Sequence, residues 1–577
     1  MSSDAVDLQA LEPLLVPAPR RLELTGGWGA PQPWTESLEP GLAPEAYRLC
    51  VGEHGSEVVA SGRSGLLRGR ATLIQLERQY GARCPRLVIE DGPATPHRGV
   101  LLDVSRDRVP SPEFLRHFVD RCAALKANHF ELYTEHTFAY EGHETVWRDA
   151  SPLTPADIQS LDQFCSEREL ALGANQNTLG HFERWLTHPK YAPLAETHDF
   201  FEFDGIRLQG PFSLCPDDPR SLALVRDLLD QLLPNFTSGR VNIGGDEALD
   251  VGQGRSAERV AREGRFEVFR AHLEAVADHA RGQGFRPAFW ADLALLHPEH
   301  LEELPEDLLP LVWGYEADSP LRSQCEALAA TGRVPWVCPG TSAWRSFTGR
   351  TAERRANLQA AVDALNCGAA RGLMITEWGD LGHRQVDAIG ALAQAEALAR
   401  AWNPSAEVDL RAIALHVFDD RSLQVARWLD RLGDVDRDLR ESSRRLADGQ
   451  GVRGLANATA LFEELHPSGF GFPLQPDAEA WTSVSERLDD LAAERPRELE
   501  PRLEAELLLA LDQARFAAAL GRWRRAGCDA RHGEHLERCL ERLLDSQRQT
   551  WARVSRPGGL ERALDHWRAP TVFRRTL

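Results

Sequence analysis

The sequence predicts an α/β protein built around a (β/α)8 TIM barrel, with a small α/β domain before the barrel and a helical region after it. Three observations support this fold class. Eight short apolar runs follow one another from residue 98 onward, most of them are separated by segments of helical period, and no comparable run appears after about residue 400. The predicted parts are therefore residues 1–93, 94–400 and 401–577.

The first part has the pattern of a small α/β domain. Strand-like runs begin at Ala46, Ser56 and Arg86, and the helix-like stretch LLRGRATLIQLERQY begins at Leu66. The segment DGPATPHRG that follows contains glycines and two prolines, which favours a linker.

The middle part supplies the barrel strands. The expected strands are GVLLDV from Gly99, HFELYTE from His129, LALGANQ from Leu170, RVNIGGDE from Arg240, RPAFWAD from Arg286, LPLVWGYE from Leu309, VPWVCPG from Val334 and GLMITEW from Gly372. Helices are expected after Pro110, with Ser111 as the N-cap, and from Pro155. A doubly wound sheet is the alternative, but no GxGxxG follows the first strand and an open sheet seldom needs eight such units.

The last part is predicted to be a helical bundle or hairpin packed on the barrel. The stretches that begin at Arg421 and Pro501 have a period of 3.6 residues and dense charge.

Charge and composition exclude several classes of protein. The 577 residues include 66 Lys plus Arg and 87 Asp plus Glu, and no cationic run occurs, so a nucleic-acid partner is not expected. No apolar stretch approaches the roughly 18 residues of a membrane span, and the first residues lack a basic segment followed by an apolar one. We therefore expect a cytoplasmic protein without a membrane partner.

Metal and thiol chemistry have no support in the motifs. The ten cysteines are scattered singly without a CxxC. His97, His129, His136 and His181 form neither HxH nor HExxH, so no metal and no cofactor are expected. No G-x-S-x-G elbow, Walker loop or cysteine-nucleophile context is present either.

Polar residues end most of the apolar runs, where a barrel of this kind carries its chemistry. These residues are Asp103, Glu135, Asn175, Asp246 with Glu247, Asp292, Glu316 and Asp380. They predict a mouth rich in carboxylates, although strand ends are often polar for structural reasons alone.

The sharpest motif is VNIGGDEALD, residues 241–250. Its glycines allow a tight turn against a ligand, and Asp246 and Glu247 can then both face the cavity. Repulsion between adjacent carboxylates favours keeping one of them protonated, as a general acid requires. A solvated acidic turn is the alternative. A diguanylate cyclase signature is disfavoured, because Ala248 stands where that signature has phenylalanine and the segment is a strand.

Tryptophans cluster at the ends of the later runs. They are Trp290, Trp313, Trp336, Trp344 and Trp378. Aromatic faces flanked by carboxylates suit a sugar, whose C–H face stacks while its hydroxyls bind the acids. Core packing is the alternative for any single one of them.

Taken in order, these motifs resemble glycoside hydrolase family 20, the β-N-acetylhexosaminidases. The resemblance covers roughly residues 45–390 and rests on HRGVLLDVSRDRVP from His97, NTLGHF from Asn177, NIGGDE from Asn242, FWAD from Phe289, VWGYE from Val312 and TEWGD from Thr376. SGLLRGRATLIQL from Ser64 is similar to the small domain that precedes the barrel in this family.

The resemblance implies a role for each site residue. Glu247 would be the general acid/base, and Asp246 would hold the substrate acetamide. The others would be Arg98 on ring hydroxyls, His181 supporting the acid together with Glu135, Trp290, Trp313 and Trp378 as pocket walls, and Asp380 on the far hydroxyls.

Two departures from the family pattern indicate a divergent bacterial-type subgroup. The family's acetamide-binding tyrosine usually follows the seventh strand, but the last tyrosine here is Tyr315, after the sixth. Either Tyr315 substitutes for it, or Trp344 and Ser342 reshape that contact. The segment LYTEHTF from Leu132 also differs from the family's usual histidine-tryptophan form.

The implied activity is that of an exo-acting, retaining β-N-acetylhexosaminidase that removes terminal GlcNAc or GalNAc without a cofactor. In this chemistry the substrate amide oxygen is the nucleophile and an oxazolinium ion is the intermediate. The expected partner is an N-acetylhexosamine-containing oligosaccharide or glycoconjugate. The alternatives are another amino-sugar or disaccharide specificity, and a catalytically silent sugar-binding protein on the same scaffold.

Overall fold

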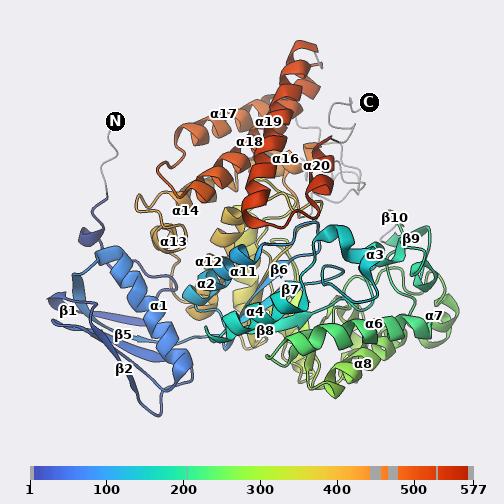
Figure 1. The fold of residues 1–577 in the computed structure, drawn as a ribbon, viewed down its shortest axis with the longest axis horizontal. Coiled ribbons are helices and arrows are strands. Elements are labelled where there is room, and N and C mark those ends of the chain that lie inside the picture. Colours follow the sequence, from blue (N-terminus) through green and yellow to red (C-terminus); the bar gives the residue numbers. More distant parts are fainter. Residues whose placement is uncertain (1–5, 204–205, 442–456, 466–477, 528–529, 569–577) are drawn as a thin grey trace.

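The computed structural model describes residues 6–203, 206–441, 457–465, 478–527 and 530–568. It contains a sheet domain, a closed barrel and a set of helices packed against one side of that barrel, over α12 (Asp387–Trp402) (Figure 1). The predicted fold class is therefore confirmed. Residues 442–449 of the stretch that begins at Arg421, and Cys528, lie outside the described residues.

The N-terminal domain is a five-stranded sheet with one long helix on it. The strand order is β1-β5-β3-β4-β2. The elements are β1 (Arg21–Gly29), β2 (Trp34–Leu38), β3 (Tyr47–Val51), β4 (Ser56–Ala60), α1 (Arg63–Tyr80) and β5 (Cys84–Asp91). The sequence did not indicate β1 and β2, because most of their side chains are exposed or half-buried and the apolar alternation of a half-buried strand is missing.

All eight predicted barrel runs are strands, and together they close a parallel barrel. In barrel order they are β6 (His97–Asp103), β7 (His129–Tyr133), β8 (Ala171–Asn175), β11 (Arg240–Asn242), β12 (Arg286–Trp290), β13 (Leu309–Trp313), β14 (Trp336–Cys338) and β15 (Gly372–Glu377). An antiparallel hairpin of β9 (Phe200–Phe203) and β10 (Ile206–Gln209) is inserted after β8.

Helices cover the outside of the barrel. The longer ones are α2 (Pro112–Ala124), α4 (Pro155–Ser166), α6 (Pro219–Leu232), α8 (Arg265–Gly282), α10 (Leu321–Ala330), α11 (Thr351–Asn366) and α12 (Asp387–Trp402), and the short ones are α3 (Glu144–Trp147), α5 (Glu183–Leu186), α7 (Ala257–Glu263) and α9 (Asp292–Leu295). The predicted cap of α2 is confirmed, since the Ser111 hydroxyl accepts a hydrogen bond from the Phe114 N–H.

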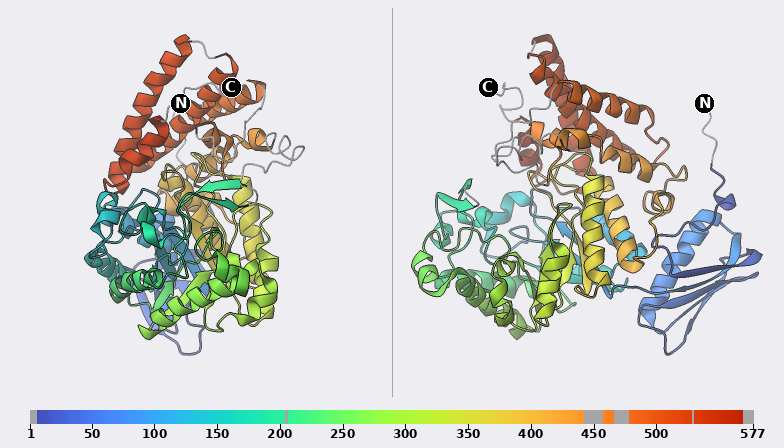
Figure 2. Two further views of the ribbon diagram at one scale, coloured as in Figure 1. Left: turned by 90° about the vertical axis from the view of Figure 1, so that its right-hand side faces the viewer. Right: turned by 180° about the vertical axis from the view of Figure 1, so that it is seen from behind.

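The C-terminal region is helical, as predicted. It contains α13 (Leu410–Val417), α14 (Val425–Leu432), α16 (Ala460–Leu465), α17 (Ala478–Ala493), α18 (Pro501–Arg525), α19 (Ala530–Val554) and α20 (Leu560–Arg568). It meets the barrel just beyond the end of β6, where Arg562 Nε lies 2.6 Å from Asp107 Oδ1 and Pro110 pairs with Ser555. Both views of Figure 2 show these orange and red helices on the same side of the barrel. No helix of the described residues is both long and apolar enough to span a bilayer.

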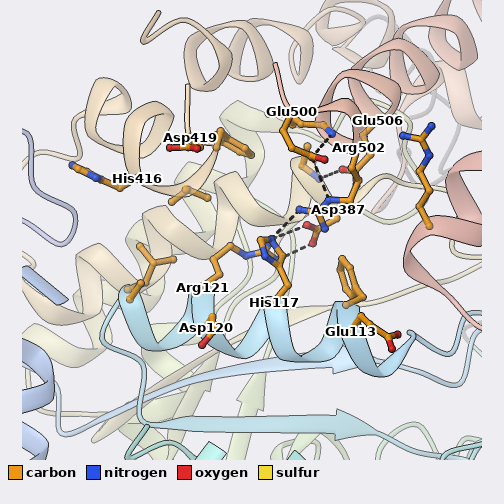
Figure 3. Close-up of a pocket in the computed structure, with 18 of the residues that line it drawn as sticks. Glu113, His117, Asp120, Arg121, Asp387, His416, Asp419, Glu500, Arg502 and Glu506 are labelled. Atoms are coloured by element: carbon orange, nitrogen blue, oxygen red, sulfur yellow. Dashed lines mark hydrogen bonds and ion pairs between the residues drawn. The ribbon is translucent and has the colours of Figure 1, made fainter. Parts of the chain in front are cut away.

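A cleft of about 670 Å³ lies where the barrel helices α2 and α12 meet α18 (Figure 3). Arg121 and Asp387 form a two-bond ion pair in it, with N–O distances of 2.6 and 2.8 Å. Glu506 of α18 is buried beside them and accepts a hydrogen bond from the Ala388 N–H. Burial, followed by the charge of Asp387, raises the pKa of Glu506 from the ordinary 4.5 to about 7.

This carboxyl group should make the junction sensitive to pH. The folded protein binds the Glu506 proton more tightly than the unfolded chain does. The protonated carboxyl group therefore makes its full contribution to the stability of the folded state below about pH 4.5, and this contribution is lost as the pH rises through about 7. We expect the wild-type Tm to fall between pH 6 and pH 8. Glu506→Gln should flatten that slope and raise the Tm at pH 8 in differential scanning calorimetry. Glu504→Gln, which alters a half-exposed residue of the same helix, is the control. Equal slopes for wild type and Glu506→Gln would contradict the assignment.

Candidate active site

One cavity of about 100 Å³ opens among the residues that follow the barrel strands. It is lined by Arg106, His181, Asp246, Glu247, Trp290, Trp313, Tyr315, Trp344, Trp378, Asp380 and Asn457. Nine of these residues, His181 among them, were predicted from the sequence as site residues. The tertiary structure adds Arg106 and Asn457.

The turn after β11 explains the two glycines of the GGDE motif. Gly244 and Gly245 have φ angles of +70° and +91°, in the left-handed region that favours glycine. A Cβ atom on Gly244 would also lie 2.6 Å from Asn177 Oδ1. Gly180 packs just as closely, because its Cβ would lie 2.5 Å from the carbonyl oxygen of Asp246. The NTLGHF and NIGGDE motifs therefore pack closely against each other, and their glycines make this close approach possible.

Asp246 and Glu247 differ in their surroundings although they are adjacent. The Asp246 side chain is buried, and its Oδ1 atom has no hydrogen-bond partner among the described residues. The Glu247 side chain is 41% exposed and faces the cavity. A buried acceptor beside a more exposed carboxyl group is suited to bind a substrate N–H while its neighbour exchanges protons with solvent.

His181 contacts both carboxyl groups through one ring nitrogen. Its Nε2 atom is 3.1 Å from Asp246 Oδ2 and 3.4 Å from Glu247 Oε2. Burial disfavours the imidazolium, but the charge of Asp246 and the contacts with both carboxylates outweigh it and raise the pKa of His181 well above its ordinary value. On the other side of the ring, Nδ1 lies 3.7 Å from Glu135 Oε1. Glu135 is thus behind His181 rather than on the cavity wall.

Asp292 fixes the backbone that carries Glu247. It accepts hydrogen bonds from the Glu247 N–H at 3.0 Å and from Trp313 Nε1 at 3.2 Å. Burial, followed by the charge of Asp246, raises the pKa of Asp292 to about 7. The sequence marked Asp292 only as a polar strand end, because nothing in the linear order shows which backbone group it meets.

Arg106 lies close to three acidic residues, of which Asp380 also lines the cavity. Its guanidinium lies 3.3 Å from Asp103, 3.2 Å from Glu135 and 4.0 Å from Asp380. It also stacks over the rings of Tyr133 and Trp378, at 4.5 and 5.2 Å from their centroids. Burial raises the pKa of Glu135 to about 7, although the charges of Arg106 and His181 oppose that shift.

The prediction that Arg98 contacts ring hydroxyls is wrong. Arg98 is the second residue of β6, five residues before the strand end and therefore roughly 16 Å from it along the strand. Its guanidinium is buried and donates to Glu45 at 2.5 Å and to the carbonyl oxygens of Thr95 and Lys126 at 2.7 and 3.0 Å. Arg98 thus connects the N-terminal domain to the far end of the barrel.

Arg106 occupies the position that was assigned to Arg98. Both belong to the motif HRGVLLDVSRDRVP, but Arg106 stands three residues beyond the end of β6, at the face that carries the cavity. That position past the apolar run was the signal that could have identified it.

Aromatic rings form the remaining walls. Tyr315, which follows β13, packs edge-on against Trp344 at 5.0 Å and stacks on Trp313 at 5.1 Å. Trp290 and Trp378 lie 6.1 Å apart on another side. Tyr315 and Trp344 both line the cavity, whereas Ser342 does not. Trp336 points elsewhere, because its ring contacts His97 and His129 near the start of the strands.

The histidines considered as metal ligands, and disfavoured because of their spacing, do not come together around His181. His129 contacts Glu131 at 2.7 Å, and His97 packs on Trp336, away from His181. The described residues contain no group of three His, Cys, Asp or Glu side chains arranged to hold a metal ion.

Two family models match the chain. The model of the glycosyl hydrolase family 20 catalytic domain matches residues 95–333, and that of domain 2 of the same family matches residues 5–92. Together they span more than half of the sequence. The chain belongs to glycosyl hydrolase family 20. Both matches end before the C-terminal helices and before Trp344, Trp378, Asp380 and Asn457.

Curated relatives and solved structures agree with this family. Hexosaminidase D of Bos taurus is 29% identical over 217 residues, which are 35% of this chain and 58% of that protein. The β-hexosaminidase of Akkermansia muciniphila is 26% identical over 321 residues, or 49% of this chain and 63% of that protein. The chain thus spans less than two thirds of either relative. The crystal structure of Flavobacterium johnsoniae chitobiase shares the fold, with a TM-score of 0.57, 15% identity, and coverage of 93% of this chain and 99% of that one.

Proposed function

We propose that this family 20 protein is an exo-acting, retaining β-N-acetylhexosaminidase that removes terminal GlcNAc or GalNAc residues. The observation that carries the proposal is the pair formed by Asp246 and Glu247. One member is a buried carboxylate with an oxygen that no other described residue pairs with, the other is accessible, and both open into a pocket walled by tryptophans. Both relatives described above are hexosaminidases by name, which supports the same substrate class.

The reaction follows from the roles of these two carboxyl groups. Glu247 protonates the glycosidic oxygen while the substrate's acetamide oxygen attacks C1, so that the C1–O bond to the leaving group breaks as the oxazolinium ring closes. Asp246 accepts the acetamide N–H, and its negative charge stabilises the positive charge that develops there. Glu247 then takes a proton from water, which attacks C1 and reopens the ring with net retention.

The surrounding residues would position the sugar for this chemistry. His181 holds Asp246 and Glu247 in place from one side, and Asp292 holds the Glu247 backbone from the other.

A panel of aryl β-glycosides assayed with purified protein tests the proposal. We expect turnover of the N-acetylglucosaminide or the N-acetylgalactosaminide and almost none of the glucoside and galactoside, which lack the acetamide nucleophile. Binding of N-acetylglucosamine without turnover of any aryl glycoside would favour the catalytically silent sugar-binding protein instead. Faster turnover of the glucoside would contradict the substrate class.

Arg106 and Arg98 form a matched pair of variants. Arg106→Lys keeps the positive charge but removes the planar guanidinium group that contacts Asp103, Glu135 and Asp380. The substitution should therefore weaken N-acetylglucosamine binding about tenfold. Arg98→Lys should lower the Tm and leave the affinity unchanged, because its partners belong to the N-terminal side of the barrel. Isothermal calorimetry and thermal melts separate the two effects. Loss of affinity in Arg98→Lys alone would reverse the assignment.

A further inference from the structure

One residue of the cavity wall comes from the C-terminal helical region. Asn457 precedes α16 and lines the cavity together with Trp344, Tyr315 and Asp380. It lies beyond the residues matched by the two family models.

Two barrel loops hold Asn457 in place. Its backbone N–H donates to Glu316 Oε1 at 2.7 Å, and Glu316 is the next residue after Tyr315 in the loop that follows β13. Two residues further on, the Thr459 N–H donates to the carbonyl oxygen of Arg345, the neighbour of Trp344. The Arg345 guanidinium also pairs with Glu463 of α16 at 2.5 Å. The loops that carry two of the aromatic walls therefore also position Asn457.

The backbone of Asn457 explains part of the residue choice. Its φ angle is +52°, in the left-handed region where asparagine is tolerated better than most residues. Glycine would satisfy that backbone equally well, so the conformation alone does not require a carboxamide side chain.

The side chain has unused hydrogen-bonding capacity. Its Oδ1 atom is shielded from solvent and has no hydrogen-bond partner among the described residues. Shielded polar atoms in native proteins are nearly always paired, and an exception calls for a specific explanation. Here the atom belongs to a residue of a cavity that has acids and aromatic walls, the arrangement that binds sugar hydroxyls.

We propose that Asn457 is a substrate-binding residue, whose carboxamide oxygen accepts a hydrogen bond from a hydroxyl group of the terminal sugar. This inference rests on the proposed function and extends it, because it makes the C-terminal helical region part of the sugar site. The contact is with a non-reacting hydroxyl, so it contributes equally to ground-state and transition-state binding and appears in KM rather than in kcat.

The test compares two replacements of Asn457 by their affinity for N-acetylglucosamine and N-acetylgalactosamine, measured by isothermal calorimetry. Asn457→Gly removes the carboxamide and keeps the positive φ, whereas Asn457→Ala removes it and strains the backbone. Both should weaken binding roughly 3- to 10-fold, the range for one net hydrogen bond. A larger loss for one of the two sugars assigns the contact to the C4 hydroxyl, the only centre at which they differ.

Asn235→Ala is the matched control. Asn235 is buried and hydrogen-bonded to Gln159, but it lies before β11, at the opposite end of the barrel. It should lower the Tm without changing the affinity. Aryl glycoside kinetics give a second readout, in which both Asn457 variants raise KM with little change in kcat.

The outcomes separate this inference from the proposed function. Unchanged affinity in Asn457→Gly, or a loss no greater than that of Asn235→Ala, overturns the role of Asn457 while wild-type hydrolysis of the N-acetylhexosaminides still supports the function. Failure of the wild type to bind either sugar overturns both.

Discussion

Replacing Glu247 with glutamine should lower kcat by a factor of at least 10²–10⁴ on substrates with poor leaving groups, the usual contribution of general acid–base catalysis. The amide keeps the shape of the side chain and loses the proton that the leaving oxygen requires. Binding should change little, because the backbone of residue 247 remains held by Asp292. Steady-state kinetics with an alkyl and a dinitrophenyl N-acetylglucosaminide measure the effect.

The choice of leaving group provides the internal control. A dinitrophenolate leaves without protonation, so its release should be impaired far less than that of an alkoxide by Glu247→Gln. Glu258→Gln, an exposed residue of α7, should be indistinguishable from wild type with both substrates. If Glu247→Gln retained more than half of the wild-type kcat on the alkyl glycoside, another residue would have to be the acid.

Replacing Asp246 with asparagine should lower the rate by roughly 10²–10³, the scale for removing one preorganised electrostatic contact from a developing charge. The carboxylate is buried and close to His181, so its charge acts in a poorly screened environment. The variant should lose most of its rate even with the dinitrophenyl substrate, because the acetamide must still close the ring. This distinguishes Asp246→Asn from Glu247→Gln.

A thiazoline mimic of the bicyclic intermediate probes the same contact from the binding side. It should inhibit the wild type competitively and more tightly than substrate binds, as intermediate-like ligands do. Asp246→Asn should lose much of that advantage. Trapping of a covalent glycosyl-enzyme on a carboxylate would show an ordinary two-carboxylate mechanism and refute the role of Asp246.

Local sequence patterns were sufficient for the barrel. Each of its eight strands is buried on both faces and therefore appears as a short apolar run, and the N-cap of α2 is the adjacent Ser111. The outer strands β1 and β2 were missed because their exposed side chains leave no such pattern.

The residues of the candidate site also fall into two groups, those that local sequence patterns identify and those that only long-range contacts reveal. Asp246, Glu247 and the wall tryptophans follow the apolar runs directly, so the sequence by itself placed them at the mouth of the barrel. The roles of Asp292, Arg106 and Asn457 depended on contacts between segments far apart in the chain. Asp292 contacts the Glu247 backbone, 45 residues away in the chain, and Asn457 contacts Glu316, 141 residues away.

The sequence determined which residues end each strand, because that is a property of neighbouring residues. Arg106 rather than Arg98 lines the cavity because the direction of β6 sends one to each end of the barrel. Only the tertiary structure decided that Asn457 belongs to the pocket, because the packing of the C-terminal helices brings it there.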